Sequence, residues 1–400
     1  MIQFPPSLPI PPEVLDIART LEQAGHETWC VGGAVRDALM GEGNKDYDLA
    51  TAAKPEEVQA LFRRTIPIGI EHGTVAVLGR SRHPHEVTTF RRDVATDGRH
   101  AVVRFGASLD EDLARRDFTI NAIAFHPLRL EWRDPFSGRE DLERGIVRAV
   151  GTAAERFQED YLRILRGVRF AGRYAFTIEP ATWSAMVERS PGLQGLSAER
   201  VRDEWSRSLL SARKPSEVVR RWGDLGALAI WLPEVDASRA DLVENLSSRD
   251  PVLVTTLLSV DAAPALARLR FPNVAIERGR ALARLRGLRP VPGDRPSARR
   301  WMAEAGAAVD DLLALAGAED PRWADAMRTS VAAVRASGAP LSLDALAITG
   351  DDLLAAGVIV GPEIGRTLRR LLEAVLDDPS RNTRKELLEM VKDAVMERRG

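Results

Sequence analysis

The chain has 400 residues, of which 44% are hydrophobic and 28% are charged, and its formal net charge is −2. This composition is typical of a soluble protein, and the length is sufficient for two to four domains. No apolar run is long enough to span a bilayer, and the first residues lack the layout of a signal peptide. The single cysteine, Cys30, excludes an intrachain disulfide framework, and the six scattered histidines show no zinc-binding spacing. We therefore expect a cytoplasmic protein without a membrane partner.

The first predicted element is an amphipathic helix over residues 11–25. A short apolar run over residues 29–31 follows and indicates a buried strand. Gly32 and Gly33 then lead into a helical segment that carries Arg36 near its start. Backbone N–H groups at such a turn and at the helix N-terminus can hold a phosphate, to which Arg36 would add a guanidinium fork.

Two aspartates, Asp46 and Asp48, are two residues apart in the next predicted strand. Alternation along a strand directs both carboxylates to one face and Tyr47 to the other. Two hard oxygen ligands beside a phosphate-binding turn suit Mg²⁺-assisted phosphoryl or nucleotidyl transfer. Each half alone has an ordinary structural interpretation, a Gly-Gly turn or a solvated Asp-x-Asp turn, and their order and closeness favour the functional one. The segment contains neither a P-loop nor a dinucleotide-binding glycine pattern.

A helix is predicted over residues 55–62 and strands over residues 74–78 and 85–90. If the last strand lies beside the strand of the two aspartates, Glu86 could supply a third carboxylate near the metals. The structural alternative is a surface glutamate at the start of a strand. Residues 91–104 are polar, contain glycine and are rich in arginine, which predicts a mobile loop.

Residues 109–122 have a helical pattern that contains Arg115, Arg116 and Asp117. The two arginines could hold a triphosphate while Asp117 orients one of them. The alternative is a charged, solvated helix face. From about residue 140 the pattern becomes almost continuously helical.

The most informative later helix is predicted over residues 157–170. Asp160, Arg163 and Arg166 recur every third residue, so they share one face, and Arg169 lies at its edge. Three arginines exceed what one carboxylate can neutralise, so an anion or a nucleobase is a natural partner, although exposed i,i+3 ion pairing is the alternative. An aspartate–arginine pair on a rigid helix can also present donors and acceptors as a base edge does, and so select a nucleobase.

The C-terminal half is predicted to be helical, with a proline-rich linker at residues 289–296. Residues 268–300 contain ten arginines against only two acidic residues, Glu277 and Asp294. Such an excess could follow a phosphate backbone. The alternative is a solvated helical face in a chain that uses 51 arginines and 5 lysines.

Taken together, these residues resemble those of the class II tRNA nucleotidyltransferases, the family of CCA-adding enzymes and bacterial poly(A) polymerases. The matching stretches follow the family's order within residues 27–205: Val31-Gly-Gly-Ala-Val-Arg-Asp37, Asp46-Tyr-Asp48, Glu86-Val-Thr-Thr-Phe90, Arg115-Arg-Asp-Phe-Thr-Ile-Asn-Ala122, Asp134-Pro-Phe136, Glu159-Asp-Tyr-Leu-Arg-Ile-Leu-Arg166 and Ser197-Ala-Glu-Arg200. The resemblance implies an α+β fold, in which a small nucleotidyltransferase-type mixed β-sheet head of five strands precedes an all-helical neck, body and tail. The expected boundaries are residues 1–140 for the catalytic head, 141–210 for the neck, 211–290 for the body and 291–400 for the tail.

The resemblance also implies roles for the matched positions. Asp46 and Asp48 would bind two Mg²⁺ ions and, with Glu86, form the catalytic set. Asp160 and Arg163 would read the Watson–Crick edge of CTP or ATP in place of a template. The full set of implied nucleotide-binding residues is Gly32, Gly33, Arg36, Arg116, Asp117, Asn121, Glu159, Asp160, Arg163, Arg166 and Arg169. The implied partner is the acceptor stem and 3′ end of tRNA, gripped by the tail, and no protein partner is implied.

The expected activity is template-independent addition of CMP and AMP to the tRNA 3′ end. Residues 94–101 lack the tyrosine and proline that the family carries in the loop linked to switching from C to A addition, so a specialist CC-adding or A-adding enzyme is an alternative. A poly(A) polymerase is another, although the chain ends in residues of mixed charge rather than a basic extension. Outside enzymes, the alternative is a catalytically silent tRNA-binding module. No His-Asp dipeptide occurs, so we expect no metal-dependent phosphohydrolase domain.

Overall fold

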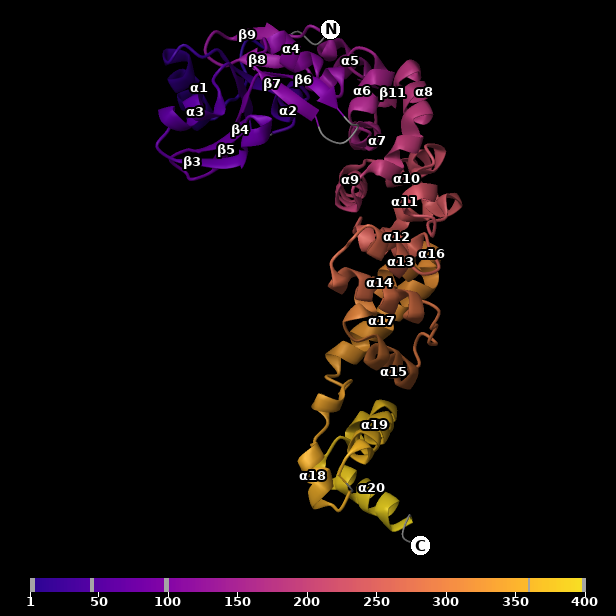
Figure 1. The fold of residues 1–400 in the computed structure, drawn as a ribbon. Helices are drawn as coiled ribbons and strands as arrows, with labels where there is room; N and C mark the ends of the chain where they lie inside the picture. The colour runs from indigo at the N-terminus through magenta and orange to yellow at the C-terminus, as the bar shows by residue number, and fades with distance from the viewer. Residues whose placement is uncertain (1–3, 44–46, 97–100, 359, 398–400) are drawn as a thin grey trace. The chain divides into compact units, whose positions relative to one another are not determined.

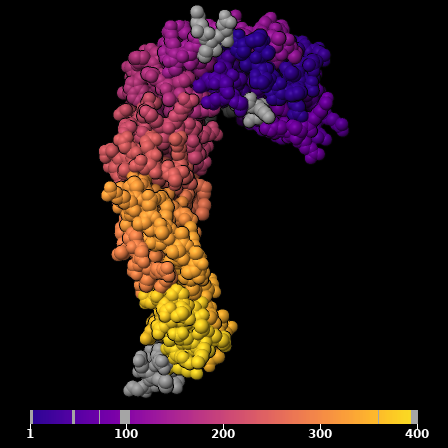
Figure 2. Space-filling view, turned by 180° about the vertical axis from the view of Figure 1, so that it is seen from behind, coloured from indigo at the N-terminus to yellow at the C-terminus, as the bar shows by residue number. Residues whose placement is uncertain are grey.

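The computed structural model of the chain describes residues 4–43, 47–96, 101–358 and 360–397 (Figure 1). The chain forms two units, which we describe separately. Unit 1 is Met1–Pro233 with Arg268–Arg270, and unit 2 is Glu234–Ala267 with Phe271–Gly400. The surface of each unit can be followed by residue number in Figure 2. The four-part division expected from the sequence stays a prediction.

Unit 1 begins with a mixed β-sheet. Among the described residues it has seven strands in the order β3-β4-β5-β2-β1-β8-β9, not the five that the resemblance implies. Strands β2 and β5 are parallel, and the other neighbouring pairs are antiparallel. Their bounds are β1 Thr28–Val31, β2 Asp48–Thr51, β3 Thr65–Gly69, β4 Thr74–Leu78, β5 Pro84–Thr89, β8 Ala124–His126 and β9 Glu131–Arg133. The predicted strands over residues 74–78 and 85–90 are confirmed. The condition set for Glu86 is also met, because β5 pairs with β2.

The two faces of this sheet are covered differently. Helices α1 (Pro12–Gln23) and α3 (Pro55–Leu61) pack against one face, on β1 and on β4 and β5 respectively. On the other face Trp29, Val31 and Ala50 join a buried cluster with residues after position 90. The buried cluster does not extend over the start of β2. Asp48 is exposed there, while its neighbours Tyr47 and Leu49 are buried. The sheet therefore leaves a carboxylate-bearing part of one face open.

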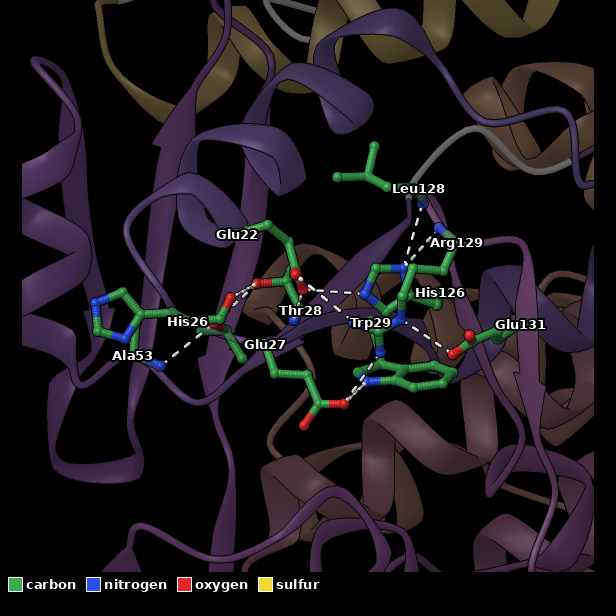
Figure 3. Close-up of polar contacts among 11 residues, drawn as sticks. Glu22, His26, Glu27, Thr28, Trp29, Ala53, His126, Leu128, Arg129 and Glu131 are labelled. Atoms are coloured by element: carbon green, nitrogen blue, oxygen red, sulfur yellow. Dashed lines mark hydrogen bonds and ion pairs between the residues drawn. The ribbon is translucent and has the colours of Figure 1, made fainter.

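Buried polar contacts hold α1 to the sheet. His126, on β8, is fully buried, and its Nε2 lies 3.0 Å from Glu22 Oε1 of α1. The His126 Nδ1 accepts the backbone N–H groups of Leu128 and Arg129, at 3.4 and 3.0 Å. Nδ1 is therefore the hydrogen-bond acceptor of the ring. The N–H group is at Nε2, and it donates a hydrogen bond to the Glu22 carboxylate. Glu22 also accepts the backbone N–H of Thr28 at 2.7 Å, so one carboxylate fixes the start of β1 and the end of β8 (Figure 3).

Two sequence-based expectations for residues 91–122 are wrong. Residues 91–104 were expected to form a loop, but β6 (Arg91–Thr96) and β7 (Ala101–Phe105) form an antiparallel hairpin, since the alternating and β-branched residues outweigh the polar ones. The helix expected over residues 109–122 stops early: α4 spans Leu109–Ala114, and only a short turn, η2 (Thr119–Asn121), follows. Asp117 Oδ1 accepts the backbone N–H of Phe118, which replaces a helical hydrogen bond.

The rest of unit 1 is mainly helical, as expected. The helix expected over residues 157–170 is, however, two helices, α6 (Ala153–Glu159) and α7 (Leu162–Tyr174), because Asp160 adopts an extended backbone conformation with φ −152°. Asp160 Oδ1 accepts the N–H of Leu162 at 3.0 Å, which caps the start of α7. The other elements are α2 Gly33–Leu39, α5 Gly138–Arg144, β10 Ile146–Val147, β11 Thr177–Ile178, α8 Pro180–Arg189, α9 Ala198–Ser211, α10 Pro215–Asp224 and α11 Ala227–Trp231.

Unit 2 is built from helices. Their bounds are α12 Pro251–Leu257, α13 Ala263–Arg268, α14 Asn273–Leu285, α15 Arg295–Ala305, α16 Val309–Glu319, α17 Pro321–Ala336, α18 Gly350–Ala355, α19 Pro362–Asp377 and α20 Arg384–Glu397. Short 3₁₀ turns complete both units: η1 Ile70–His72, η3 Ser190–Gly195, η4 Ala237–Asn245, η5 Gly306–Ala308, η6 Leu343–Ala345 and η7 Pro379–Arg381. The expected linker at residues 289–296 lies inside unit 2, where Trp323 Nε1 donates to the carbonyl of Pro290. No helix in the described part of the chain is long and apolar enough to cross a bilayer.

Candidate active site

A cleft of about 600 Å³ opens within unit 1, between the uncovered face of the sheet and helix α7. Among the described residues that line it are eight arginines and four acidic residues. The cleft brings together almost all of the predicted site: Gly32, Gly33, Arg36, Asp48, Glu86, Arg116, Asp117, Asn121, Asp160, Arg163, Arg166 and Arg169. Glu159 lies behind this lining and contacts it through Arg163. Asp46 falls outside the described residues.

The turn after β1 forms one wall. Gly32 has φ 76° and immediately precedes α2, as the sequence predicted for the phosphate-binding turn. A Cβ added at Gly32 would lie 3.2 Å from Arg116 Nη1 and 3.6 Å from Asp48 Oδ2. The absence of a side chain therefore lets an arginine and a carboxylate approach the same point of the backbone.

The two carboxylates on the sheet lie on neighbouring strands. Leu49 of β2 pairs with Val87 of β5 in parallel register, so the residues before them, Asp48 and Glu86, point to the opposite, open face. Both side chains are exposed to the cleft. Hard carboxylate oxygens are the ligands that Mg²⁺ prefers, so this donor set fits a magnesium ion. The described residues contain no group of three or more His, Cys, Asp or Glu side chains that could hold a metal on their own.

Arg36 is buried, and its donors are engaged within unit 1. Its Nε and Nη2 donate to Asp37 Oδ1 at 2.8 and 2.7 Å, and its Nη1 donates to Asn121 Oδ1. Its guanidinium also lies 5.1 Å from the ring centroids of Phe170 and Tyr174 on α7. Arg36 thus joins α2 to the helix that forms the opposite wall. Its direct contact with a phosphate stays a prediction.

The buried Asp117 forms an ion pair with the partly exposed Arg166 across the cleft. Arg166 Nε and Nη2 donate to Asp117 Oδ2 at 2.7 and 2.6 Å, and Asn121 Nδ2 donates to Oδ1 at 2.8 Å. Burial raises the pKa of Asp117, but the charge of Arg166 and the hydrogen bonds from Asn121 and Arg166 outweigh it, so the pKa lies below its usual range. Asp117 therefore orients an arginine, as expected, but that arginine is Arg166 on α7.

Arg116 is held by a residue that sequence reasoning missed. Its Nη2 donates to the buried Asp112 at 3.2 Å, and its Nη1 donates to the carbonyl of Asn121 at 3.3 Å. Asp112 also accepts Arg115 Nε at 3.1 Å. The buried Nε of Arg116 has no hydrogen-bond partner among the described residues. One aspartate of α4 thus directs two arginines towards the cleft.

The break between α6 and α7 places Asp160 and Arg163. Asp160 Oδ2 accepts Arg200 Nη2 of α9 at 2.7 Å. Arg163 donates through Nη1 to Glu159 at 2.7 Å and through Nη2 to the carbonyl of Arg115 at 2.9 Å. These contacts come from separate elements, so both side chains have fixed positions at the cleft wall. Arg200 belongs to the matched stretch after Ser197, but its role as a partner of Asp160 was not predicted.

Two further contacts support this wall. Arg169 Nε donates to the buried Glu204 of α9 at 2.7 Å. Burial lowers the pKa of Arg169, against the opposing charge of Glu204. At the break itself, Gly192 lies against the Tyr161 ring, whose nearest atom is 2.1 Å from the position of an added Cβ. Glu204 and Gly192 carry no local sequence signal, because their partners lie far away along the chain.

Comparison with known proteins agrees with this site. The family model described as "Poly A polymerase head domain" matches residues 28–148, and "Probable RNA and SrmB- binding site of polymerase A" matches residues 175–239. The CCA-adding enzyme of Streptococcus sanguinis (strain SK36) is 35% identical over 381 residues, which cover 91% of this chain and 93% of that enzyme. The chain belongs to the CCA-adding enzyme family.

Other members of the CCA-adding enzyme family match over similar lengths. The CCA-adding enzyme of Geobacillus kaustophilus (strain HTA426) is 35% identical over 395 residues, covering 94% of this chain and 95% of that one. The crystal structure of the Bacillus stearothermophilus CCA-adding enzyme in complex with CTP has a TM-score of 0.80 and 30% identity, and covers 99% of both chains. The predicted family, fold class and nucleotidyltransferase activity are therefore confirmed. Family membership also makes the activity metal-dependent in general terms.

Proposed function

We propose that this protein adds CMP and AMP to the 3′ end of tRNA without a template, taking the nucleotides from CTP and ATP. One observation carries the proposal: carboxylates at Asp48 and Glu86 face an arginine-lined helix across a cleft of about 600 Å³. This volume is in the range of small-molecule sites. The CTP complex of the 30% identical relative supports a nucleoside triphosphate as the occupant.

The carboxylates would hold divalent metal. We infer that Asp48, with Asp46 beside it in the sequence, holds two Mg²⁺ ions, and that Glu86 supports them from the neighbouring strand. Bound Mg²⁺ supplies Lewis-acid chemistry that favours deprotonation of the primer 3′-hydroxyl and neutralises phosphate charge. Gly32 and Gly33 would let the triphosphate approach the backbone, and the guanidinium of Arg116, which lines the same cleft, would add positive charge beside it.

Nucleotide selection would lie on the other wall. Asp160 supplies acceptor oxygens and Arg163 supplies N–H donors, and together they complement the edges of cytosine and adenine. Glu159 and Arg200 hold this pair in place. Arg166 and Arg169, each paired with a buried acid, would add positive charge near the sugar and phosphates. Asn121 fixes both Arg36 and Asp117. The cytoplasm, where tRNA precursors and nucleoside triphosphates meet, is the compartment that this proposal implies.

The decisive experiment supplies two tRNA substrates, one ending at the discriminator base and one already ending in CC. Each receives CTP, ATP or both, with Mg²⁺, and the products are separated on a sequencing gel. We expect CC and then A to be added. Addition of C alone or of A alone would identify a specialist enzyme, and a long A tail would identify a poly(A) polymerase.

The variant Asp48→Asn tests the proposed metal site in the same assay. We expect incorporation to fall by more than about a hundredfold, because a metal ligand is lost, while the fold is retained. Asp16→Asn, which changes an exposed aspartate on α1, is the matched control and should retain full activity. Full turnover by Asp48→Asn would rule out the metal role, and a catalytically silent tRNA-binding module would show no incorporation in any form of the protein.

A further inference from the structure

The outer strand β3 and its flanks carry exposed apolar side chains that the proposed chemistry does not use. Ile66 is 43% exposed and Ile68 is 50% exposed, and Ile70, which directly follows β3, is also exposed. We call these three residues the β3 strip. The strand is the first in the order of the sheet, so its outer edge has no neighbouring strand among the described residues. Large apolar side chains that gather at one place on a surface indicate a binding site.

Ile66 of the β3 strip lies on the face of the sheet that carries the carboxylates. Ile66 pairs with Ala76 of β4, and Ala76 pairs with Glu86 of β5. Directly paired residues point to the same side of a sheet, so Ile66 lies on the side of Glu86. The three strands lie side by side in Figure 1. Two strand spacings separate Ile66 from Glu86, which is about 10 Å. One or two nucleotides can bridge this distance.

The backbone of β3 is poorly suited to pairing with another strand. Pro67 has no N–H group to donate, and the register with β4 shifts between Pro67 and Gly69. Prolines and bulges protect natural edge strands from strand addition. A second copy of the chain or an extended peptide is therefore a weak candidate for the occupant of the strip.

The charges beside the strip indicate a different occupant. Arg63 and Arg64 directly precede β3, and both are exposed. Sites for single-stranded nucleic acid combine cationic side chains that contact phosphates with side chains that cover the bases, most often aromatic ones. Here the exposed isoleucines supply apolar surface that unpaired bases can cover.

We propose that the β3 strip binds the unpaired bases immediately upstream of the primer 3′-hydroxyl, while Arg63 and Arg64 contact the phosphates between them. The inference rests on the proposed function, because it assigns the strip to the RNA substrate of the same cleft. It would place the reacting hydroxyl at the carboxylates and the preceding bases on the isoleucines.

The test compares the double variant Ile66→Ser/Ile68→Ser with wild type in AMP addition to an RNA hairpin that ends in an unpaired CC. We expect the KM for the RNA to rise by about five- to tenfold, because the variant removes apolar surface that the bases would cover. The KM for ATP and equilibrium binding of CTP should not change. The conservative variant Ile66→Leu/Ile68→Leu should restore the RNA KM, and Leu210→Ser, on an exposed apolar position of α9, should leave it unchanged.

The outcomes separate this inference from the proposed function. If wild type adds nucleotides and the serine variant keeps the same RNA KM, the strip does not bind the primer. A wild type that self-associates in light scattering, with a monomeric serine variant, would assign the strip to a contact between copies and overturn the inference. If wild type adds no nucleotides at all, the proposed function fails. In that case, direct binding titrations with unpaired and with fully paired RNA test the strip. If the serine variant loses affinity equally for both RNAs, or for neither, the inference is overturned.

Discussion

Two parts of the chain are rich in arginine, and the fold uses them in different ways. In the cleft of unit 1, eight arginines and four acids surround an open volume. Between residues 268 and 300, nine of the ten arginines donate to a carboxylate or a backbone carbonyl of their own unit. Arg299, for example, is buried and donates to the carbonyls of Leu376 and Asp377. Most of the second set therefore contacts groups within its own unit, and its contact with a phosphate backbone stays a prediction.

Ion pairing alone does not separate the two regions, because the arginines of α7 are paired as well. Arg163, Arg166 and Arg169 each contact an acid. The difference is the space beside them: the α7 pairs face a ligand-sized cleft with carboxylates on its far wall. An arginine-rich segment is therefore evidence for a ligand only where the fold leaves a cavity next to it.

The two arginine-rich regions can be compared by substituting one arginine at a time. The largest effect that we expect is a loss of stability in unit 2. Arg286 donates to the carbonyls of Thr256 and Ser259, both at 2.7 Å, and to Glu319 at 2.7 Å. Arg286→Ala should lower the free energy of unfolding by about 2–4 kcal/mol, since it leaves buried acceptors without a donor. Urea unfolding measures this loss. Nucleotide choice in the assay above should not change, and a shift in that choice would contradict a purely structural role.

The opposite result is expected for Arg163→Ala on α7. Discrimination against UTP should fall by about tenfold or more, because the variant loses the donors that we propose to read the base. The measurement is kcat/KM for CTP, ATP and UTP with a fixed primer. Arg280→Ala is the matched control, since Arg280 pairs with the exposed Glu277 three residues away in the same helix. An unchanged preference in Arg163→Ala would exclude base reading by this helix.

Substitution of Asp117 tests how much its charge contributes to stability. Its lowered pKa means that the carboxylate stabilises the folded state above its ordinary pKa of about 3.9, and that this contribution is lost as the pH falls below that value. Asp117→Asn should cost about 1–2 kcal/mol at pH 7. The difference from wild type should narrow as the pH falls below about 4. Denaturant unfolding at several pH values measures both effects, and a gap that stays constant with pH would contradict the role of the charge.

The smallest effect is expected for exposed pairs in the arginine-rich part of unit 2. Arg280 pairs with Glu277 and Arg284 with Glu304, and all four side chains are at least half exposed. Arg280→Gln/Arg284→Gln should change the slope of log affinity for tRNA against log salt by less than about one. A slope that becomes shallower by about two would show that both arginines contact phosphates, and would restore the phosphate-binding interpretation.

Local patterns predicted much of unit 1. Alternation placed Tyr47 and Asp48 on opposite faces of β2, and a paired strand brought Glu86 beside Asp48. The break at Asp160 was missed, because helical periodicity continues through it and the capping contact to Leu162 is visible only in three dimensions. The hairpin at residues 91–105 was missed because its polar composition masked the strand signal. Asp112 and Glu204 were missed because the arginines they hold are recognisable by motif, whereas their buried partners are not.

Gly192 has a practical consequence for engineering. Gly192 has no side chain, and its backbone lies against the Tyr161 ring. The conformation of the α6–α7 junction therefore depends on a residue far along the chain. Any larger residue there would displace the tyrosine and, with it, the neighbouring Asp160. A mutant library restricted to the walls of the cleft would miss this position, where we expect a substitution to alter nucleotide preference by moving Asp160.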